Sequence, residues 1–491
     1  YIQGKYLNFL DADDKLELSA LKKAWKFFEK HYNETDIVAM PIKFFDAARG
    51  NHMLNFKFKK GTRVVNLKKE RDMIQMSSSS SFIKAECFKN IRFDETLAYA
   101  EDAKVIQTIL MEKQTLGLLA NTAYYYRKRN SGDSAIQNSG QKSNWYLPVL
   151  NNYHLYLIEN YLNRFGEVSE FAQFALMYDL QWRIKKSEIL SLTDDEKKEY
   201  TNKLKQLLKY INDDIIMAQS HIDNDHKMLA LEMKYSSSPE LRCDTEPTFE
   251  FSKDLKFPLS GCVATFEGID IKGDELFLDA SVELYNKKYN STQFFFLVNG
   301  EKLLSEEIDL GQKVAADNVI SLKKGFSARL KISALPLKIQ LGANINGYDI
   351  VFKNLSFGKF APLSNKYKAN YFSAKGHTLF VNGNTLVISK GNAFTTLKKE
   401  IGLWLQLFRR DRLLGMVAII LRIFLRLYKF FKIKPIWIIS DRVAKAGDNG
   451  EVFFKYLCEN HKEIDARFVI KKNSEDYQRL NKIGKVLSTD S

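Results

Sequence analysis

The stretch Leu7–Asp14, which reads LNFLDADD, decides the fold of the first part of this chain. An apolar run is followed at once by acids in the pattern Asp-x-Asp-Asp, which predicts a β-strand ending at an acidic loop. Side chains two positions apart on a strand point the same way, so Asp11 and Asp13 should share one side. Two such carboxylates can hold Mg²⁺ or Mn²⁺ and leave positions for a diphosphate. The alternative is an acidic turn that caps the helix expected from about Leu18.

The residues around this stretch alternate between strand-like and helical patterns. Short apolar runs at 36–42 and 116–120 predict strands, and the segments 20–31 and 102–113 predict helices. Such alternation is typical of an α/β domain, which we expect over residues 1–145.

Two further motifs carry charged groups. Phe93-Asp94-Glu95 is followed by Tyr99-Ala100-Glu101-Asp102, where the acid pair opens a helix. The helix dipole should keep these carboxylates ionised, as a general base requires, although acids at helix starts are also common caps. Residues 124–131, YYYRKRNS, predict a strand that enters a basic loop. This loop could close on a diphosphate through Arg127 and Arg129, or it could be a solvated loop.

In this order, FLDADD, FDE…YAEDA and YYYRKRNSGDSA resemble the family-2 glycosyltransferases of the GT-A fold. The resemblance implies that Asp11 and Asp13 bind a metal ion, Mg²⁺ or Mn²⁺, and that Asp13 also meets the diphosphate of a nucleotide-sugar donor. It implies that Asp102 deprotonates the acceptor hydroxyl and that transfer inverts the anomeric carbon. The family's first βαβ units would lie before Tyr1, so we expect a glycosyltransferase domain whose N-terminal part is missing.

The middle of the chain changes character twice. Residues 146–235 are rich in helix formers, and Thr193 with Glu196 forms a capping box, so we expect a helical extension. A polar linker at 236–246 follows. Over 247–395, alternating strands and the turn signals Asn299-Gly300 and Asn382-Gly383 predict a β-sandwich accessory domain of unassigned role.

Residues 435–491 predict a second α/β region, in which strands, a glycine-containing loop and helices alternate in the manner of a parallel sheet. The string D-R-x-x-K-A-G-D-N-x-E at 441–451 resembles the opening of the CDP-glycerol:poly(glycerophosphate) glycerophosphotransferases, which have a GT-B fold. A helix near Gly450 could offer its N-terminus to an anion, although Asp448 and Asn449 could equally be plain N-caps. The motif residues are Asp441, Arg442, Lys445, Gly447, Asp448 and Asn449, and only the start of that domain is expected here.

The formal charge of +15 indicates an anionic partner. Ten of the basic residues and two acids fall in 398–434, so 10 − 2 = +8 lies in one stretch. There they are interleaved with long apolar runs, which favours an anionic membrane surface over nucleic acid. We therefore expect 397–434 to form a basic amphipathic helix lying on the membrane, or else one docked on the following domain. Its candidate membrane residues are Arg422, Phe424, Arg426, Leu427, Lys429 and Phe431.

Together these features predict a multidomain α/β protein: a partial GT-A domain, a helical segment, a β-sandwich and the beginning of a GT-B Rossmann-like domain. The length of 491 residues allows several domains, and four scattered cysteines show no metal-ligand spacing. The expected function is bacterial teichoic acid or capsule synthesis at the cytoplasmic face of the plasma membrane. Sugar from a nucleotide donor and glycerol phosphate from CDP-glycerol, or a related CDP-polyol, would pass to a lipid-linked acceptor. The alternative is a non-catalytic glycan-binding or scaffold protein with degenerate enzyme-like ends.

Overall fold

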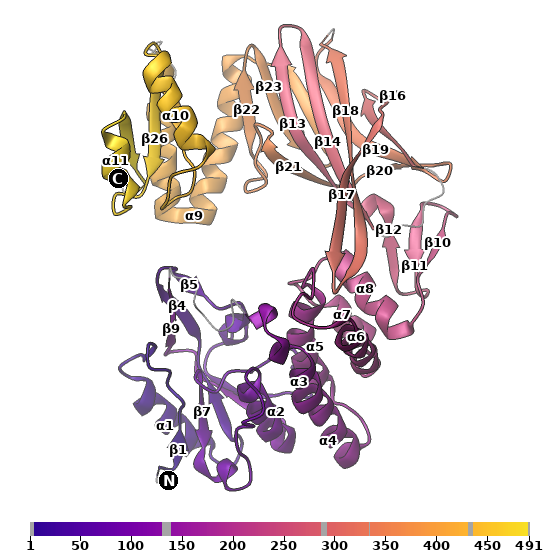
Figure 1. Cartoon of the computed structure of the whole chain (residues 1–491), viewed down its shortest axis with the longest axis vertical. Coiled ribbons are helices and arrows are strands. Elements are labelled where there is room, and N and C mark those ends of the chain that lie inside the picture. The colour runs from indigo at the N-terminus through magenta and orange to yellow at the C-terminus, as the bar shows by residue number, and fades with distance from the viewer. Residues whose placement is uncertain (1–3, 130–138, 286–291, 333, 431–435, 490–491) are drawn as a thin grey trace. The chain divides into compact units, whose positions relative to one another are not determined.

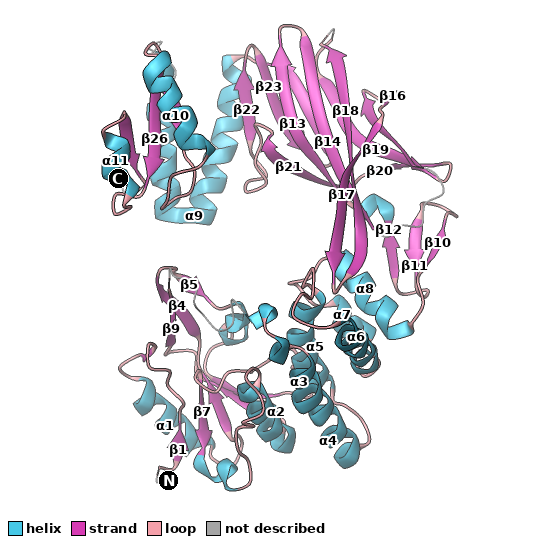
Figure 2. Ribbon diagram, in the orientation of Figure 1, coloured by secondary structure: helices cyan, strands magenta, loops and turns pink. Residues whose placement is uncertain are grey.

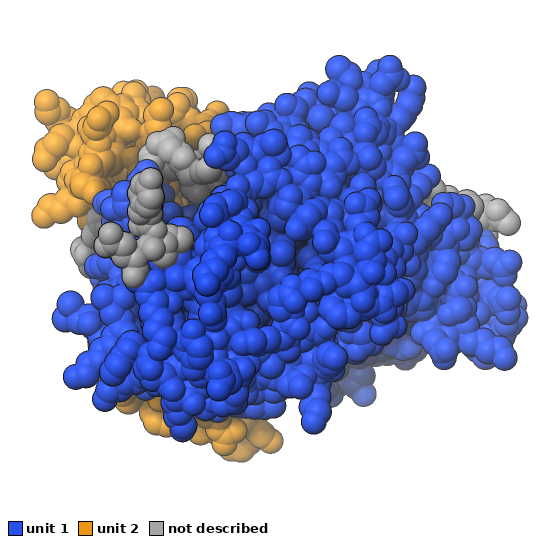
Figure 3. Space-filling view, turned by 90° about the horizontal axis from the view of Figure 1, so that it is seen from below, with its two compact units in different colours: residues 1–366, 372–391 blue, residues 367–371, 392–491 orange. Residues whose placement is uncertain are grey.

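The computed structural model describes residues 4–129, 139–285, 292–332, 334–430 and 436–489. They form two compact units (Figure 3): residues 1–366 with 372–391, and residues 367–371 with 392–491. Both units combine helices and strands (Figures 1 and 2), in agreement with the expected mixed α/β, multidomain architecture.

The first part of unit 1 is built on a five-stranded sheet of order β1-β7-β3-β8-β6, with a smaller sheet of order β2-β9-β4-β5 beside it. The predicted helices are confirmed as α1 (Ala20–His31) and α2 (Glu101–Lys113). Gly117 is required where α1 packs on the sheet, because a Cβ there would lie 2.7 Å from the Phe27 ring. The strands are β1 (Tyr6–Leu7), β2 (Lys15–Leu16), β3 (Ile37–Ala39), β4 (Ile42–Asp46), β5 (Gly50–Asn51), β6 (Arg63–Asn66), β7 (Ser81–Lys84), β8 (Thr115–Leu118) and β9 (Tyr124–Lys128).

The helical segment follows, and its capping box is confirmed: the Thr193 hydroxyl accepts from the Glu196 N–H, and the Glu196 carboxylate accepts from Thr193. A buried ionic cluster ties its helices together, because the Asp179 carboxylate lies 2.8 Å from Arg183 Nε and 3.0 Å from His154 Nε2. The elements are α3 (Leu147–Val149), a π-helical turn (Leu150–Leu155), α4 (Tyr156–Phe165), α5 (Glu170–Ile184), α6 (Asp194–Leu208), α7 (Asp213–Met217) and α8 (Asn224–Tyr235).

Two larger sheets make up the rest of unit 1, with strand orders β17-β18-β14-β13-β21 and β16-β15-β19-β24-β23-β22, where β20 also pairs with β19. The alternating residues Leu276 to Leu284 are buried along β14, as predicted. Asn299 and Gly300 both have positive φ and join β15 to β16, which confirms that hairpin, whereas the second turn falls one residue later, at Gly383-Asn384.

The bounds of these strands are β13 (Val263–Lys272), β14 (Glu275–Tyr285), β15 (Thr292–Val298), β16 (Glu301–Leu304), β17 (Glu307–Ala315), β18 (Asn318–Lys331), β19 (Leu337–Ile345), β20 (Tyr348–Val351), β21 (Asn354–Phe360), β22 (Tyr371–Ala374), β23 (His377–Asn382) and β24 (Thr385–Lys390). A short sheet of β10 (Glu240–Arg242), β11 (Thr248–Glu250) and β12 (Lys256–Pro258) precedes them.

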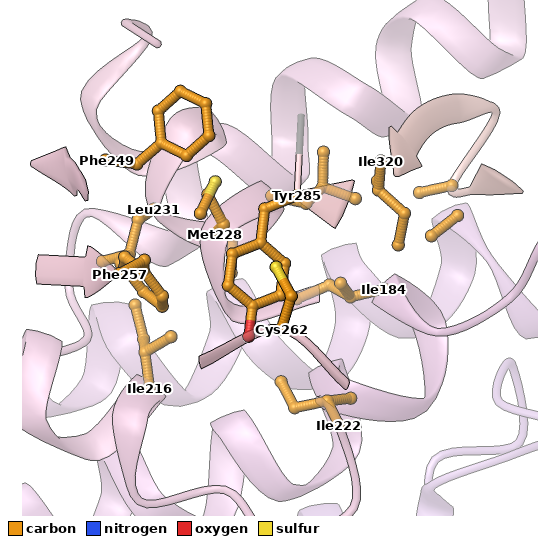
Figure 4. Packing of buried hydrophobic residues seen from close by; sticks show 14 of the residues in the cluster. Ile184, Ile216, Ile222, Met228, Leu231, Phe249, Phe257, Cys262, Tyr285 and Ile320 are labelled. Carbon is orange, nitrogen blue, oxygen red and sulfur yellow. The ribbon is translucent and has the colours of Figure 1, made fainter. Parts of the chain in front are cut away.

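The helical segment and the strands share one hydrophobic core, in which Ile184, Ile216 and Met228 pack near Phe257 and Tyr285 (Figure 4). Polar contacts reinforce the joint: Ala316 N–H donates to the Lys186 carbonyl at 2.6 Å, and Lys313 Nζ lies 2.7 Å from Asp223 and 3.1 Å from Asp225. The strands are therefore fixed onto the helices that follow the first domain.

Unit 2 begins with α9 (Ala393–Phe430), which differs from the single helix expected over 397–434. The backbone leaves the helical region at Arg412 (φ 45°, ψ −111°), so α9 is two helical arms joined by a bend. The Glu400 side chain, only 2% exposed on the first arm, pairs with Arg422 at 2.9 Å and Arg426 at 2.8 Å on the second. A buried carboxylate needs such partners, which explains why the arms lie together.

Residues 367–371 also belong to this helical hairpin. The Tyr367 hydroxyl donates to Asp411 at 2.6 Å, the Ala369 N–H donates to the Gln406 side chain at 2.8 Å, and the Tyr371 hydroxyl donates to Glu400. Residues 367–371, which lie within the predicted accessory domain 247–395, thus group with unit 2, although Tyr371 also begins β22.

The remainder of unit 2 is a three-stranded parallel sheet of order β25-β26-β27, which agrees with the predicted α/β pattern. Its elements are β25 (Ile436–Ile439), α10 (Asn449–Asn460), β26 (Asp465–Ile470), α11 (Asp476–Asn481) and β27 (Lys485–Ser488).

Candidate active site

The acidic loop lies in a turn and not on a strand. Strand β1 ends at Leu7, because Asn8 Nδ2 turns to the carbonyls of Ser79 (2.7 Å) and Ser81 (2.8 Å). The Asp14 N–H then donates to the Asp11 carbonyl at 3.1 Å and closes a turn. The strand alternation used to place Asp11 and Asp13 on one side therefore does not apply.

The hydroxyl of Tyr124 joins the acids of this loop. It lies 2.5 Å from Asp14 Oδ2 and 3.2 Å from Asp11 Oδ2. Burial raises the pKa of Asp11, and the neighbouring Asp14 and Asp13 carboxylates raise it further, while the bond from Tyr124 opposes them. The loop thus gathers negative charge in a partly desolvated place, where a cation would be stabilised.

Both predicted arginines reach this loop. Arg129 pairs with Asp13 at 2.6 Å. The Arg127 N–H donates to Asp14 at 2.7 Å, and its side chain pairs with Asp46 at 2.7 Å. The guanidinium groups stand where they could exchange a carboxylate for a diphosphate, and their role as donor ligands remains a prediction. The last residues of this motif, Asn130 and Ser131, lie outside the described residues.

Asp102 lies in the first turn of α2, where Ser78 holds it. Its carboxylate accepts from the Ser78 hydroxyl at 2.6 Å and from the Ser78 N–H at 3.2 Å. Burial raises the pKa of Asp102, the Ser78 bonds lower it, and the Asp11 charge raises it. The helix start was expected to favour the ionised form, yet here burial outweighs it. Burial also raises the pKa of Glu101, and the charges of Asp102 and Asp11 add to that rise.

Replacing Ser78 with alanine tests how Asp102 is tuned. Because both Ser78 bonds favour the charged carboxylate, losing the hydroxyl should raise the pKa of Asp102 further. The resemblance predicts that Asp102 is a general base, which acts when ionised, so the acid limb of the kcat/KM profile should move to higher pH. The pH profiles of the two proteins check this. A uniform loss of rate with an unmoved limb would mean that Ser78 only orients the carboxylate.

The serine run at 77–81 is the part of the site that sequence reasoning missed. In the structure its loop is fixed by Gln75, whose Nε2 donates to the hydroxyls of Ser80 (3.0 Å) and Ser81 (2.9 Å). A polar run entering the buried strand β7 was the one available signal, because buried hydroxyls need partners.

Asp11 and Asp13 are the oxygen ligands that Mg²⁺ or Mn²⁺ would need. Among the described residues, no group of three or more His, Cys, Asp and Glu side chains is arranged around a metal position. The protein would thus contribute two carboxylate ligands, which fits a metal ion whose remaining ligands are a diphosphate and water.

The second motif is organised around Asp441. This carboxylate accepts from the N–H groups of Asp448 (3.1 Å), Gly450 (2.7 Å) and Glu451 (3.2 Å). The N-terminus of α10, expected to receive an anion, is therefore occupied by the chain's own carboxylate. Asp448 is the N-cap and accepts from the Asn449 N–H, as the alternative had it, while Gly447 adopts a positive φ of 103°. Arg442 and Lys445 are exposed.

The candidate membrane residues divide into three groups. Arg422 and Arg426 are paired with Glu400. Phe424 and Leu427 are about three-fifths exposed. The Lys429 side chain and Phe431 lie outside the described residues. No helix in the described part of the chain is long and apolar enough to cross a membrane.

The chain is similar to proteins of teichoic acid biosynthesis. Over 99% of its length it is 30% identical to the minor teichoic acid biosynthesis protein GgaB of Bacillus subtilis strain 168, of which it spans 56%. It is 29% identical to GgaA of the same organism over 36% of this chain and 40% of GgaA.

The poly(ribitol-phosphate) β-N-acetylglucosaminyltransferase TarS of Staphylococcus aureus strain Mu50 is 25% identical over 27% of this chain and 22% of TarS. No protein-family model matches the chain. The chain spans about half the length of GgaB and less of the other two.

Proposed function

We propose that the first domain transfers a sugar from a nucleotide-sugar donor to a teichoic-acid-type acceptor, with inversion, in a metal-dependent reaction. The observation that carries this proposal is that one serine loop contacts both the acidic loop and Asp102: its Ser79 and Ser81 carbonyls accept from Asn8, and its Ser78 hydroxyl donates to Asp102. A base and a cation-binding loop at one site suit a single displacement, in which the base activates the acceptor and the cation stabilises the leaving group.

Each residue has a separate task in this reaction. Asp102 accepts the proton of the acceptor hydroxyl as its oxygen bonds to the anomeric carbon, and Ser78 orients that carboxylate. Asp11 and Asp13 would hold Mg²⁺ or Mn²⁺, which when bound neutralises charge on the departing diphosphate. Arg127 and Arg129 would bind the diphosphate in place of Asp46 and Asp13, their present partners.

A second activity, transfer of glycerol phosphate or a related polyol phosphate from a CDP donor, is proposed for the domain that 435–491 begins. Its support is the motif at 441–451 together with similarity to GgaB across the same region. The decisive assay offers the full-length protein candidate nucleotide sugars and CDP-glycerol with a lipid-linked acceptor. A product extended by both the sugar and glycerol phosphate would support two transferase activities in one protein. Glycan binding without turnover of either donor would favour the scaffold alternative.

The helical hairpin is proposed to bind the anionic cytoplasmic surface of the plasma membrane. Its bend carries Leu413 and Leu414, 73% and 77% exposed, directly after Arg409, Arg410 and Arg412. Exposed aliphatic side chains beside a cluster of arginines suit the headgroup boundary of an anionic bilayer. Since Arg422 and Arg426 are bound to Glu400, the bend takes over the role first expected of them.

Changing Leu413 and Leu414 together to glutamate should reduce binding to phosphatidylglycerol vesicles at least about tenfold. The reason is that burying each leucine side chain in the bilayer would contribute roughly 1.5–3 kcal/mol to the binding free energy. Vesicle cosedimentation at low salt measures this. The matched control is Leu304→Glu, an exposed leucine on β16. Equal losses for the control, or binding that resists high salt and yields only to detergent, would contradict the proposal.

A further inference from the structure

We infer that a small cavity around Lys57, beside the serine loop of the candidate active site, binds a phosphodiester of the acceptor. The cavity has a volume of about 110 Å³, which matches a few water molecules or one small anion. Polar groups in its lining come from Lys57, His52, Asn55, Gln75, Ser77, Ser80 and Tyr178. The inference rests on the proposed glycosyl transfer, because that reaction makes the bound group part of an acceptor.

Lys57 is a buried amine that has no counter-charge among the residues that the structure describes. Its side chain is only 3% exposed, and its Nζ donates to two neutral groups, the Ile74 carbonyl and Gln75 Oε1 at 2.6 Å. Within the described residues no Asp or Glu forms an ion pair with it. Burying an unpaired charge is costly, and burial lowers the pKa of Lys57 to about 7. An anion entering the cavity would supply the missing partner.

The other groups in the lining do not compete for this role. Burial together with the Lys57 charge lowers the pKa of His52 to about 4, so its ring is neutral near pH 7. Its Nδ1 accepts from the Leu54 N–H at 3.2 Å. Ser77, Ser80 and Tyr178 bring hydroxyl groups, which are suitable donors to phosphate oxygens. The cavity therefore has one positive charge, neutral donors around it and no negative charge in its lining.

The position of the cavity assigns the anion to the acceptor. Ser77 and Ser80 line the cavity, and Ser78 between them holds Asp102, the proposed base. A phosphate bound at Lys57 would thus lie beside the loop that holds Asp102, as a group of the acceptor would. The relative TarS acts, by its name, on poly(ribitol-phosphate), whose repeat carries such a phosphodiester.

Dimethyl phosphate is the probe for a test, because it keeps one negative charge across the relevant pH range. Calorimetry on the full-length protein, in buffers of different ionisation enthalpy, should show binding coupled to proton uptake above about pH 7. The sign follows from the anion favouring protonated Lys57, so affinity should rise on the order of tenfold from pH 8.5 to pH 6. Lys57→Met should weaken binding at least about tenfold and remove this dependence. Lys59→Met, an exposed neighbour, should do neither.

Three results would overturn the inference. One is dimethyl phosphate that fails to bind the wild type saturably, and another is equal affinity for folded Lys57→Met. The third is Lys57-dependent binding of UDP without binding of dimethyl phosphate, which would assign the cavity to the donor. If Lys57→Met does not fold, the pH dependence of the wild type and a Ser80→Val variant decide the matter. The assay needs no sugar donor, so an inactive enzyme that still binds the probe would refute glycosyl transfer and leave the anion site standing.

Discussion

Asp102→Asn is expected to lower kcat at least about 100-fold while leaving donor affinity nearly unchanged, because an amide cannot take the acceptor proton but keeps the shape of the side chain. Its oxygen can still accept from Ser78, so the loop should stay in place. Steady-state kinetics with varied donor and acceptor measure both quantities. The acid limb assigned to Asp102 should also disappear from the residual rate.

Glu101→Gln is the matched control for this variant. Glu101 adjoins Asp102, and burial raises the pKa of both carboxyl groups, but the bonds from Ser78 go to Asp102. A small effect of Glu101→Gln on kcat, together with a large effect of Asp102→Asn, would show that Asp102 and not the neighbouring carboxylate acts as the base. If donor affinity collapses in Asp102→Asn while turnover survives, Asp102 is a binding residue.

Asp13→Ala is expected to abolish sugar transfer, with a loss of at least about 100-fold, because a metal ion stabilises a leaving diphosphate by several kcal/mol. The fold should persist, since Asp13 lies in a turn and is about one-third exposed. Wild-type activity should likewise vanish with a chelator and return with Mn²⁺. Glycerophosphate transfer onto a preformed acceptor should continue in Asp13→Ala, since the proposal gives that reaction a separate domain.

Asp46→Ala controls for the loss of an arginine partner. Asp46 pairs with Arg127 much as Asp13 pairs with Arg129, but it lies outside the acidic loop. It should retain metal-dependent transfer. Sugar transfer by wild-type protein at its normal rate in the presence of chelator would refute the metal assignment, and joint loss of both activities in Asp13→Ala would indicate one composite site.

The sequence predicted the elements whose signals are local. Helix α1 and the Thr193–Glu196 capping box follow from periodicity and from a contact three residues apart. The Asn299-Gly300 hairpin follows because both residues tolerate positive φ. Motif order likewise indicated Asp11, Asp13 and Asp102 as candidates, because it needs no knowledge of the distances between them.

What the sequence could not supply depended on distant partners. The bend at Arg412 interrupts a continuous helical pattern, and its reason, Glu400 pairing with Arg422 and Arg426, spans more than twenty residues. Ser78 meets Asp102 across 24 positions, and Asp441 reaches past a glycine loop to the start of α10. In each case a buried or capping carboxylate contacts a residue that is distant in the sequence, and the spacing of residues along the chain does not reveal such a contact.

The contact of residues 367–371 with the helical hairpin governs how this protein can be dissected. Tyr367, Ala369 and Tyr371 hold the hairpin by hydrogen bonds, while the covalent connection enters separately at Asn392. A single proteolytic nick between these two points should leave the fragments associated until denaturant is added. A piece expressed from residue 393 onward would leave Asp411, Gln406 and Glu400 without these partners, and a peptide of residues 367–371 supplied in trans should restore them. Unit 2 is thus a discontinuous folding module, made of residues 367–371 and residues 392–491.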